Sequence, residues 1–179
     1  MVLQACIEIL STEENTWITI PNGDLDTAIS DFVGDKDWKV AMVLDTKAEF
    51  LNNSFHKVDN IFEFNSLLVE LEEHHHFSSN DVKNLSVLNM LLEDRNFDLR
   101  QVTQIMINEE YKIHNVKSIG EVAKEYLEET SSWYREVKEQ ETNFDNYFDF
   151  EKWGEEMLEA NGTWLHDEDN GFILEVLDV

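Results

Sequence analysis

The sequence predicts an α+β protein of three small domains: a mixed α+β domain at residues 1–59, a helical domain at 60–103, and an α+β domain with a short antiparallel sheet at 104–179. Two observations carry this prediction. The two-residue alternation of strands occurs near both ends of the chain, whereas the middle shows only helical spacing of apolar residues. Apolar residues make up 42% of 179, enough to build hydrophobic cores.

The first domain combines three expected strands with one short helix. The strands are VLQACIEIL at residues 2–10, TWITI at 16–20 and WKVAMVL at 38–44. Pro21, the only proline, breaks the chain after the second strand. The helix opens at Asp24 and ends at Gly34. Its apolar positions recur at helical spacing and predict one buried face: Leu25, Ala28, Ile29 and Phe32.

The middle domain is expected to be helical throughout. One helix begins at Asn60, a second begins at Ser78 or Ser79, and a third helical segment runs over residues 98–105. Three consecutive histidines, residues 74–76, separate the first two helices. Consecutive side chains point in different directions, so a solvated linker is a better interpretation than a metal site.

The third domain is expected to hold two helices and a small sheet. Ser118 caps the first helix, with Glu121 three residues later as a capping box. An acidic connector leads to a second helix that begins at Asp149 and ends at Asn161–Gly162. This helix is expected to bury Phe150, Trp153 and Met157. A strand at Tyr111–Asn115 precedes these helices. The last segment predicts a hairpin in which Asn170–Gly171 turns between Trp164–Leu165 and Phe172–Val176.

The acidic run at the hairpin, residues 167–171, resembles the start of a calcium loop. Its glycine stands one position too early, and no Glu occupies the closing position. A hairpin tip is therefore the better interpretation, and we expect no metal site in the protein.

Charge limits the classes of partner. The chain has 39 acidic and 13 basic residues, a formal net charge of −26, and residues 104–179 carry −14 of it. Self-repulsion of this size opposes folding, which favours a function that requires negative charge. Nucleic acid and anionic membranes are disfavoured as direct partners. Basic proteins, and proteins that themselves bind nucleic acid, are favoured.

Other chemistry is sparse in this sequence. Cys6 is the only cysteine and lies in an apolar run, which predicts a small buried side chain and excludes an internal disulfide. No phosphate-binding loop or nucleophile motif stands out, so we expect no enzyme and no cofactor. Without a secretory signal or an apolar run of about 20 residues, we expect a cytosolic protein.

Rows of carboxylates on the expected helices are the candidate binding surface. Side chains three or four residues apart on a helix lie roughly 5–6 Å apart. Phosphates along one strand of B-DNA repeat at about 3.4 Å along the helix axis, and the curvature of the groove and backbone spreads them further, so rows of carboxylates can imitate a phosphate track. A solvated helix face is the simpler alternative for any single row. The candidate residues are Glu121, Glu125, Glu128, Glu129, Glu136, Glu139, Glu141, Asp145, Glu151, Glu155, Glu156 and Glu159.

The third domain also resembles a known family. EEYKIHNVKSIGEVAKEYLEET, NYFDFEKWGEEMLEANGTWL and the closing GFILEV are similar to the C-terminal domain of the ArdA antirestriction proteins, and TWITIPNGDLDTAI is similar to an earlier part of the family. Glu155–Glu156 stands where the family has Arg–Asp, which makes this chain more acidic. The residues that match the two helical motifs are Ala123, Tyr126, Glu128, Glu129, Thr130, Tyr147, Phe148, Asp149, Phe150, Gly154 and Leu158, followed by Gly162.

The resemblance implies an elongated three-domain protein that forms a homodimer and imitates bent B-form DNA. It implies inhibition of type I restriction–modification enzymes in the bacterial cytosol, evasion of host defence, and carriage on a phage or other mobile element. An anti-CRISPR protein, or another inhibitor of a nucleic-acid-binding complex, remains an alternative with the same mechanism. An acidic chaperone or interaction module and a carboxylate-based hydrolase are alternatives of other classes.

Overall fold

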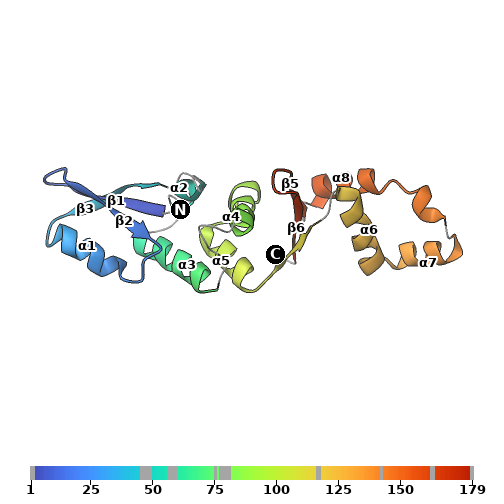
Figure 1. Ribbon diagram of the computed structural model, residues 1–179, viewed down its shortest axis with the longest axis horizontal. Helices are drawn as coiled ribbons and strands as arrows, with labels where there is room; N and C mark the ends of the chain where they lie inside the picture. The colour runs from blue at the N-terminus through green and yellow to red at the C-terminus, as the bar shows by residue number, and fades with distance from the viewer. Residues whose placement is uncertain are drawn as a thin grey trace. The chain divides into compact units, whose positions relative to one another are not determined.

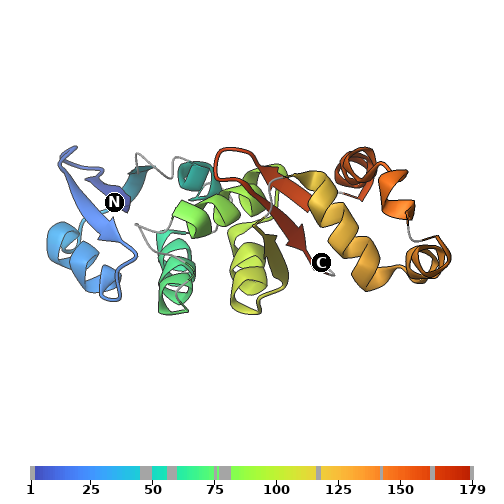
Figure 2. The same cartoon turned by 45° about the vertical axis from the view of Figure 1, so that its right-hand side comes forward.

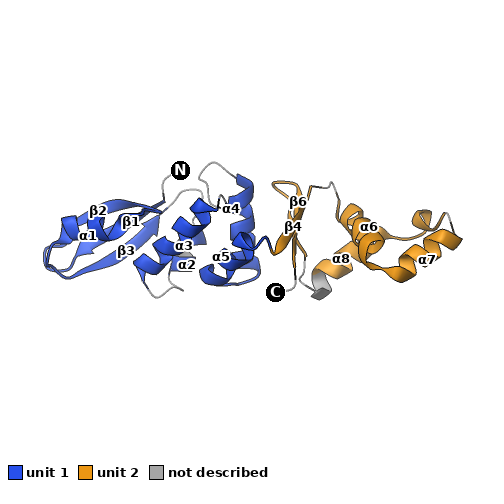
Figure 3. Cartoon of the chain, turned by 90° about the horizontal axis from the view of Figure 1, so that it is seen from below, with its two compact units in different colours: residues 1–109 blue, residues 110–179 orange. Residues whose placement is uncertain are grey.

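A computed structural model describes residues 3–44, 50–55, 60–74, 76, 82–115, 118–141, 143–161 and 164–177. The chain forms two compact units, Met1–Glu109 and Glu110–Val179 (Figure 3). The second unit begins after helix α5 (Leu99–Ile107), so the expected boundary at residue 104 falls inside that helix. A further division of the first unit at residue 60 stays a prediction. The α+β class is confirmed, because each unit holds a three-stranded antiparallel sheet.

The first unit begins with the sheet β2–β1–β3, formed by β1 (Leu3–Ile9), β2 (Asn15–Ile20) and β3 (Trp38–Leu44). Alternate residues of β1, from Leu3 to Ile9, are buried and pair with Ile18 and Ile20 of β2 on the same face. Helix α1 (Leu25–Val33) lies beside this sheet and buries Leu25, Ile29 and Val33 (Figure 1). The three strands and the helix expected from the sequence are confirmed, but Ala28 and Phe32 of the expected buried face are only half-buried.

Helices complete the first unit: α2 (Phe50–Phe55), α3 (Ile61–Glu73), α4 (Val82–Asn89), the π-helical turn η1 (Met90–Asp94) and α5. Asn60 caps α3 as expected, by accepting a hydrogen bond from the Glu63 N–H at 2.9 Å. Asp98 and Gln101 form a reciprocal capping box at the start of α5. Helix α2 was not expected. The cap expected for α4 at residues 78–79 lies outside the described residues, as does the middle histidine of residues 74–76.

The second unit is built on the sheet β4–β6–β5, formed by β4 (Tyr111–His114), β5 (Trp164–Asp167) and β6 (Phe172–Val176). The hairpin is confirmed, but its loop consists of the four residues 168–171 instead of the expected two, Asn170 and Gly171. The Asp167 carboxylate accepts the Asn170 N–H at 2.9 Å, and Gly171 adopts a φ of 67° that favours glycine. This acidic segment is therefore a hairpin tip, as expected.

Three helices extend from that sheet: α6 (Ile119–Thr130), α7 (Ser132–Gln140) and α8 (Phe150–Asn161). Figure 2 shows α6 with the hairpin near one end and α7 near the other. The expected acidic connector is wrong for residues 132–140, which are helical, and a 3₁₀ turn η2 (Phe144–Asn146) follows. Ser131 ends α6 and caps α7, so these two helices meet at a single residue.

The core of the second unit lies where α6 and α8 meet the sheet. Its buried centre consists of Ile119, Val122, Ala123, Trp164 and Ile173. Trp164 of β5 is only 2% exposed. Trp153, Phe150 and Met157 of α8 were expected to be buried, but they are partly exposed and pack around this centre.

Gly154 permits the close approach of α8 to α6. A Cβ added there would lie 2.7 Å from Ile119 Cγ1, closer than such atoms pack, and 3.0 Å from the Ile119 carbonyl oxygen, which is a tight contact. We expect Gly154→Val to lower the free energy of unfolding by about 2–3 kcal/mol, because overpacking forces the helices apart. Urea denaturation checks this. Glu155→Val, on the exposed face of the same helix, is the control for valine's helix propensity, and an equal loss in both variants would contradict the packing role of Gly154.

Candidate partner-binding surface

The predicted carboxylates lie on α6, α7, α8 and the turns beside them. The inner face of α6 buries Ile119, Val122, Ala123 and Leu127, which leaves its glutamates outside. Ser118 caps this helix by accepting the Glu121 N–H at 3.3 Å, as half of the expected capping box. Helix α8 is capped by Asp149, whose carboxylate accepts the Lys152 N–H at 3.0 Å. Ten of the twelve predicted acids are exposed: Glu121, Glu125, Glu128, Glu129, Glu136, Glu139, Glu141, Glu151, Glu155 and Glu156.

The other two predicted acids differ from these ten. Asp145 in η2 is half-buried, with its side chain 26% exposed. Glu159 lies on α8, but its side chain is outside the described part of the structure. Whether each predicted acid contacts a partner stays a prediction.

Some of the exposed acids contact groups of their own unit. Glu151 accepts the Gly120 N–H at 3.0 Å, which places a negative charge at the start of α6 where the helix dipole favours it. Glu129 pairs with Lys112 at 3.2 Å, and Glu156 lies 4.0 Å from Lys152. Glu128 pairs with Lys138. These acids therefore help to hold the unit together, whatever else they bind.

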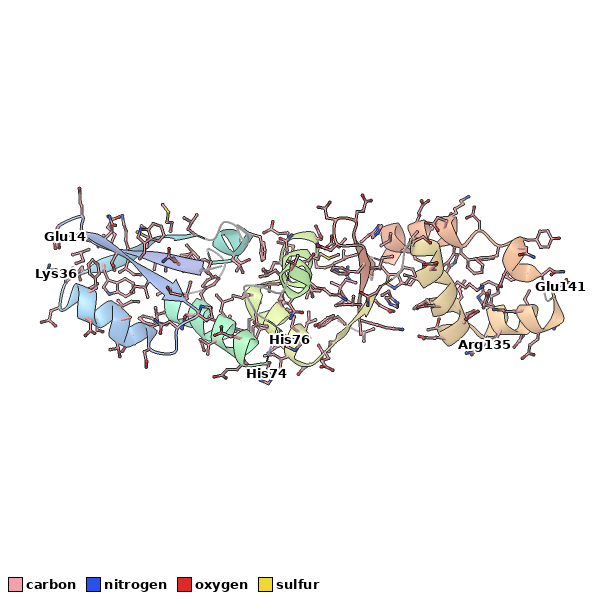
Figure 4. The ribbon with its side chains drawn as sticks, viewed as in Figure 1. Glu14, Lys36, His74, His76, Arg135 and Glu141 are labelled. Atoms are coloured by element: carbon pink, nitrogen blue, oxygen red, sulfur yellow. The ribbon has the colours of Figure 1, made fainter. Side chains whose placement is uncertain are left out.

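The acids of α7 are different. Among the described residues, the structure gives no ion pair and no side-chain hydrogen bond to Glu136, Glu139 or Glu141, and the same holds for Glu155 on α8. Figure 4 shows Arg135 on α7 and Glu141 just beyond its end. Glu136 and Glu139 of α7 are thus exposed carboxylates for which the described residues provide no ion pair within 4.0 Å.

Glu175 on β6 is an acid that faces inward. Its carboxylate lies 2.8 Å from His114 Nε2, while the other ring nitrogen of His114 lies 3.7 Å from Glu125 on α6. The hydrogen bond with His114 holds the pKa of Glu175 below its ordinary value, against the opposing effect of burial. Glu175 belongs to the interior of the unit and not to the candidate surface.

A network of charged and aromatic side chains joins α6, α7 and η2. The Tyr134 hydroxyl donates to Asp145 Oδ1 at 2.7 Å, and Asp145 Oδ2 lies 2.7 Å from Lys124 Nζ and 3.3 Å from Lys138 Nζ. We call Lys124, Glu128, Tyr134, Lys138 and Asp145 the clamp. Tyr134 is fully buried. Its ring is surrounded by those of Trp133, Phe144, Phe148 and Phe150, with centroids 5.9–6.5 Å away.

These contacts shift the pKa values within the clamp. Hydrogen bonds from Lys124 and Tyr134 lower the pKa of Asp145 to about 2. Burial, followed by the hydrogen bond to Asp145, raises the pKa of Tyr134 to about 12. The hydrogen bond to Glu128 raises the pKa of Lys138. At neutral pH Tyr134 is therefore neutral, whereas Asp145 and Lys138 are charged.

The lowered pKa of Asp145 predicts a pH-dependent contribution to stability. A carboxyl whose pKa is lower in the folded state stabilises the fold above its unfolded pKa of 3.8, and that stabilisation is lost as the pH falls toward 2. We expect Asp145→Asn to be less stable than wild type by a constant amount above about pH 5, and the difference to shrink between pH 4 and 2. Urea denaturation of both proteins across this range checks it. A difference that does not change with pH would contradict the role of the Asp145 charge.

Neither the clamp nor α7 was expected from the sequence. Two local signals point to α7: the paired serines before it, which can cap a helix, and the helical spacing of Trp133, Tyr134 and Val137. The contacts of Asp145 carry no such local signal, because its partners are distant in the chain. No helix in the described part of the chain is long and apolar enough to cross a membrane. The described residues include no cluster of metal-ligating side chains, and His74 and His76 lie near the end of α3 (Figure 4).

Comparison with known proteins gave one family. Searches of curated proteins and of solved structures found no match. The model of the family described as antirestriction protein (ArdA) matches residues 14–170. This match spans both compact units and includes the helices that carry the acidic surface. The chain therefore belongs to the ArdA family of antirestriction proteins.

Proposed function

We propose that the protein blocks type I restriction–modification enzymes by occupying their DNA-binding groove as an acidic mimic of B-form DNA. The observation that supports this most strongly is that acidic and basic side chains of the second unit differ in their contacts. Exposed carboxylates lie on three helices, whereas the bases described there contact acids or carbonyl groups of the same unit. The outer surface therefore presents anions to a partner with little competing positive charge.

Such a surface suits a protein that binds DNA. A DNA-binding groove uses Lys and Arg to neutralise phosphates, and the same side chains accept carboxylates in charge-assisted hydrogen bonds. A helix presents its glutamates roughly 5–6 Å apart at three- and four-residue spacing, so several can bind bases that otherwise contact successive phosphates. The shared ligand chemistry means that the inhibitor and DNA exclude one another.

The experiment that tests this function is a plating assay with unmodified phage. Bacteria with an active type I restriction system, expressing the protein, are expected to admit the phage at nearly the efficiency of a restriction-deficient host. The same assay in matched hosts that instead carry an active CRISPR system and a targeting guide distinguishes an antirestriction protein from an anti-CRISPR protein. Protection of phage from CRISPR alone would replace the proposed target, and protection in neither host would contradict the proposed function.

A further inference from the structure

We propose that the clamp positions α7, so that Glu136 and Glu139 are held where the partner's bases meet them. This inference rests on the proposed function and adds the residues that orient the binding surface. Its unexpected element is that two lysines, which oppose the acidic character of the surface, are required for binding.

The connection between α6 and α7 alone does not orient α7. Ser131 is the only residue between the two helices, and its backbone is extended, with φ −98° and ψ 112°. Its hydroxyl oxygen accepts the Tyr134 N–H at 3.3 Å, which caps α7 but leaves the angle between the helices to other contacts. A single extended residue acts as a hinge, because small changes in two dihedral angles swing the whole of the next helix.

The clamp restricts rotation about Ser131 through contacts that join α7 to α6 and η2. Lys138 reaches back from the last turn of α7 to Glu128 on α6 and to Asp145 in η2, while Lys124 of α6 binds the same Asp145 carboxylate. Tyr134 connects the first turn of α7 to Asp145 through its buried hydroxyl. Both ends of α7 are thereby tied to α6, either directly or through the single carboxylate of Asp145.

Arg135 supplies a further attachment of the helix. Its guanidinium donates to the carbonyl oxygens of Glu128 and Glu129 at 3.2 and 3.0 Å, which satisfies groups at the end of α6 that have no helical partner. Arg135, Lys138, Glu128 and Glu139 line a hollow beside Tyr134. The bases of α7 therefore bind their own unit, which leaves Glu136 and Glu139 as the charges that α7 presents outward.

Substituting two different lysines distinguishes an effect of the position of α7 on binding from an effect of net charge. Lys138→Gln and Lys152→Gln each make the protein more negative by one charge. If charge alone sets affinity for a basic groove, both variants bind a purified type I enzyme more tightly than wild type. If the clamp positions α7, we expect Lys138→Gln to bind about 10-fold more weakly, because α7 must be ordered during binding, while Lys152→Gln binds at least as tightly as wild type. We expect Lys138→Arg, which keeps the cation, to restore most of the affinity.

The salt dependence of binding distinguishes positioning from partial unfolding. A variant with a smaller folded fraction loses affinity, but the slope of log K against log salt is unchanged, because the folded molecules make the same contacts. Loss of the α7 contacts instead lowers that slope for Lys138→Gln. Equal affinity and slope in Lys138→Gln and Lys152→Gln would overturn the clamp proposal. Failure of duplex DNA to displace the wild-type protein would overturn the proposed function instead, so the two failures are distinguishable.

Discussion

Reversing the charges of Glu136 and Glu139 together, as Glu136→Lys/Glu139→Lys, is expected to weaken binding to the type I enzyme by about three orders of magnitude. Each reversal removes one attraction and adds one repulsion, at roughly 1 kcal/mol each, and about 4 kcal/mol in total corresponds to nearly 1000-fold. Isothermal titration or a competition assay at constant salt measures the change. Both residues are exposed and lack an ion pair among the described residues, so the fold is expected to survive.

The hairpin tip offers a matched control for this variant. Glu168 and Asp169 are also exposed and lie in the same unit, but they are outside the predicted surface. Glu168→Lys/Asp169→Lys makes the same change in net charge, and we expect it to weaken binding by less than about 10-fold through long-range effects alone. If both double variants lose the same affinity, binding depends on total charge and not on α7.

The largest effect on stability is expected from Trp164→Ala. Trp164 is 2% exposed and packs edge-to-face on Tyr126, with ring centroids 5.3 Å apart. Removing a buried Trp costs about 3–5 kcal/mol, which is most of the stability of a unit this small. We expect the unfolding transition of the second unit to move to much lower urea concentration, or to be lost, as followed by circular dichroism.

Two other aromatic residues serve as comparisons for Trp164. Trp153 was the core tryptophan expected from the sequence, but it is partly exposed, so Trp153→Ala is expected to cost less. Tyr147 is 85% exposed, and Tyr147→Ala is expected to change the free energy of unfolding by less than about 0.5 kcal/mol. A loss below about 1 kcal/mol for Trp164→Ala would contradict its central place in the core.

The parts of the fold that were predictable are those with local signals. Ser118 before a periodic apolar run marks α6, and Gly171 marks a hairpin because the turn needs its positive φ. Helix α7 lacks a broad apolar face, since Tyr134 is its one fully buried side chain, and the apolar rings around Tyr134 lie mostly after the helix in the chain. Its stability comes from tertiary contacts that periodicity cannot reveal.

The candidate surface was predictable only in part for a similar reason. Helical spacing identifies which acids face outward, and ten of the predicted residues are exposed. Spacing does not show which acids have partners from other elements. Asp145 and Glu128 resemble surface acids in the sequence, yet both bind Lys138 within the unit. Only the position of α7 in the fold shows which acids pair with Lys138 and which remain exposed without an ion pair among the described residues.

Competition with DNA tests the central claim most directly. A labelled complex of the protein and a purified type I enzyme is titrated with unmodified duplex DNA at several salt concentrations. The proposed mimicry predicts that DNA displaces the protein, with an apparent dissociation constant that rises in proportion to the DNA concentration, and that log K falls linearly with log salt. A complex that stays intact at saturating DNA would contradict the claim that the protein occupies the DNA-binding groove.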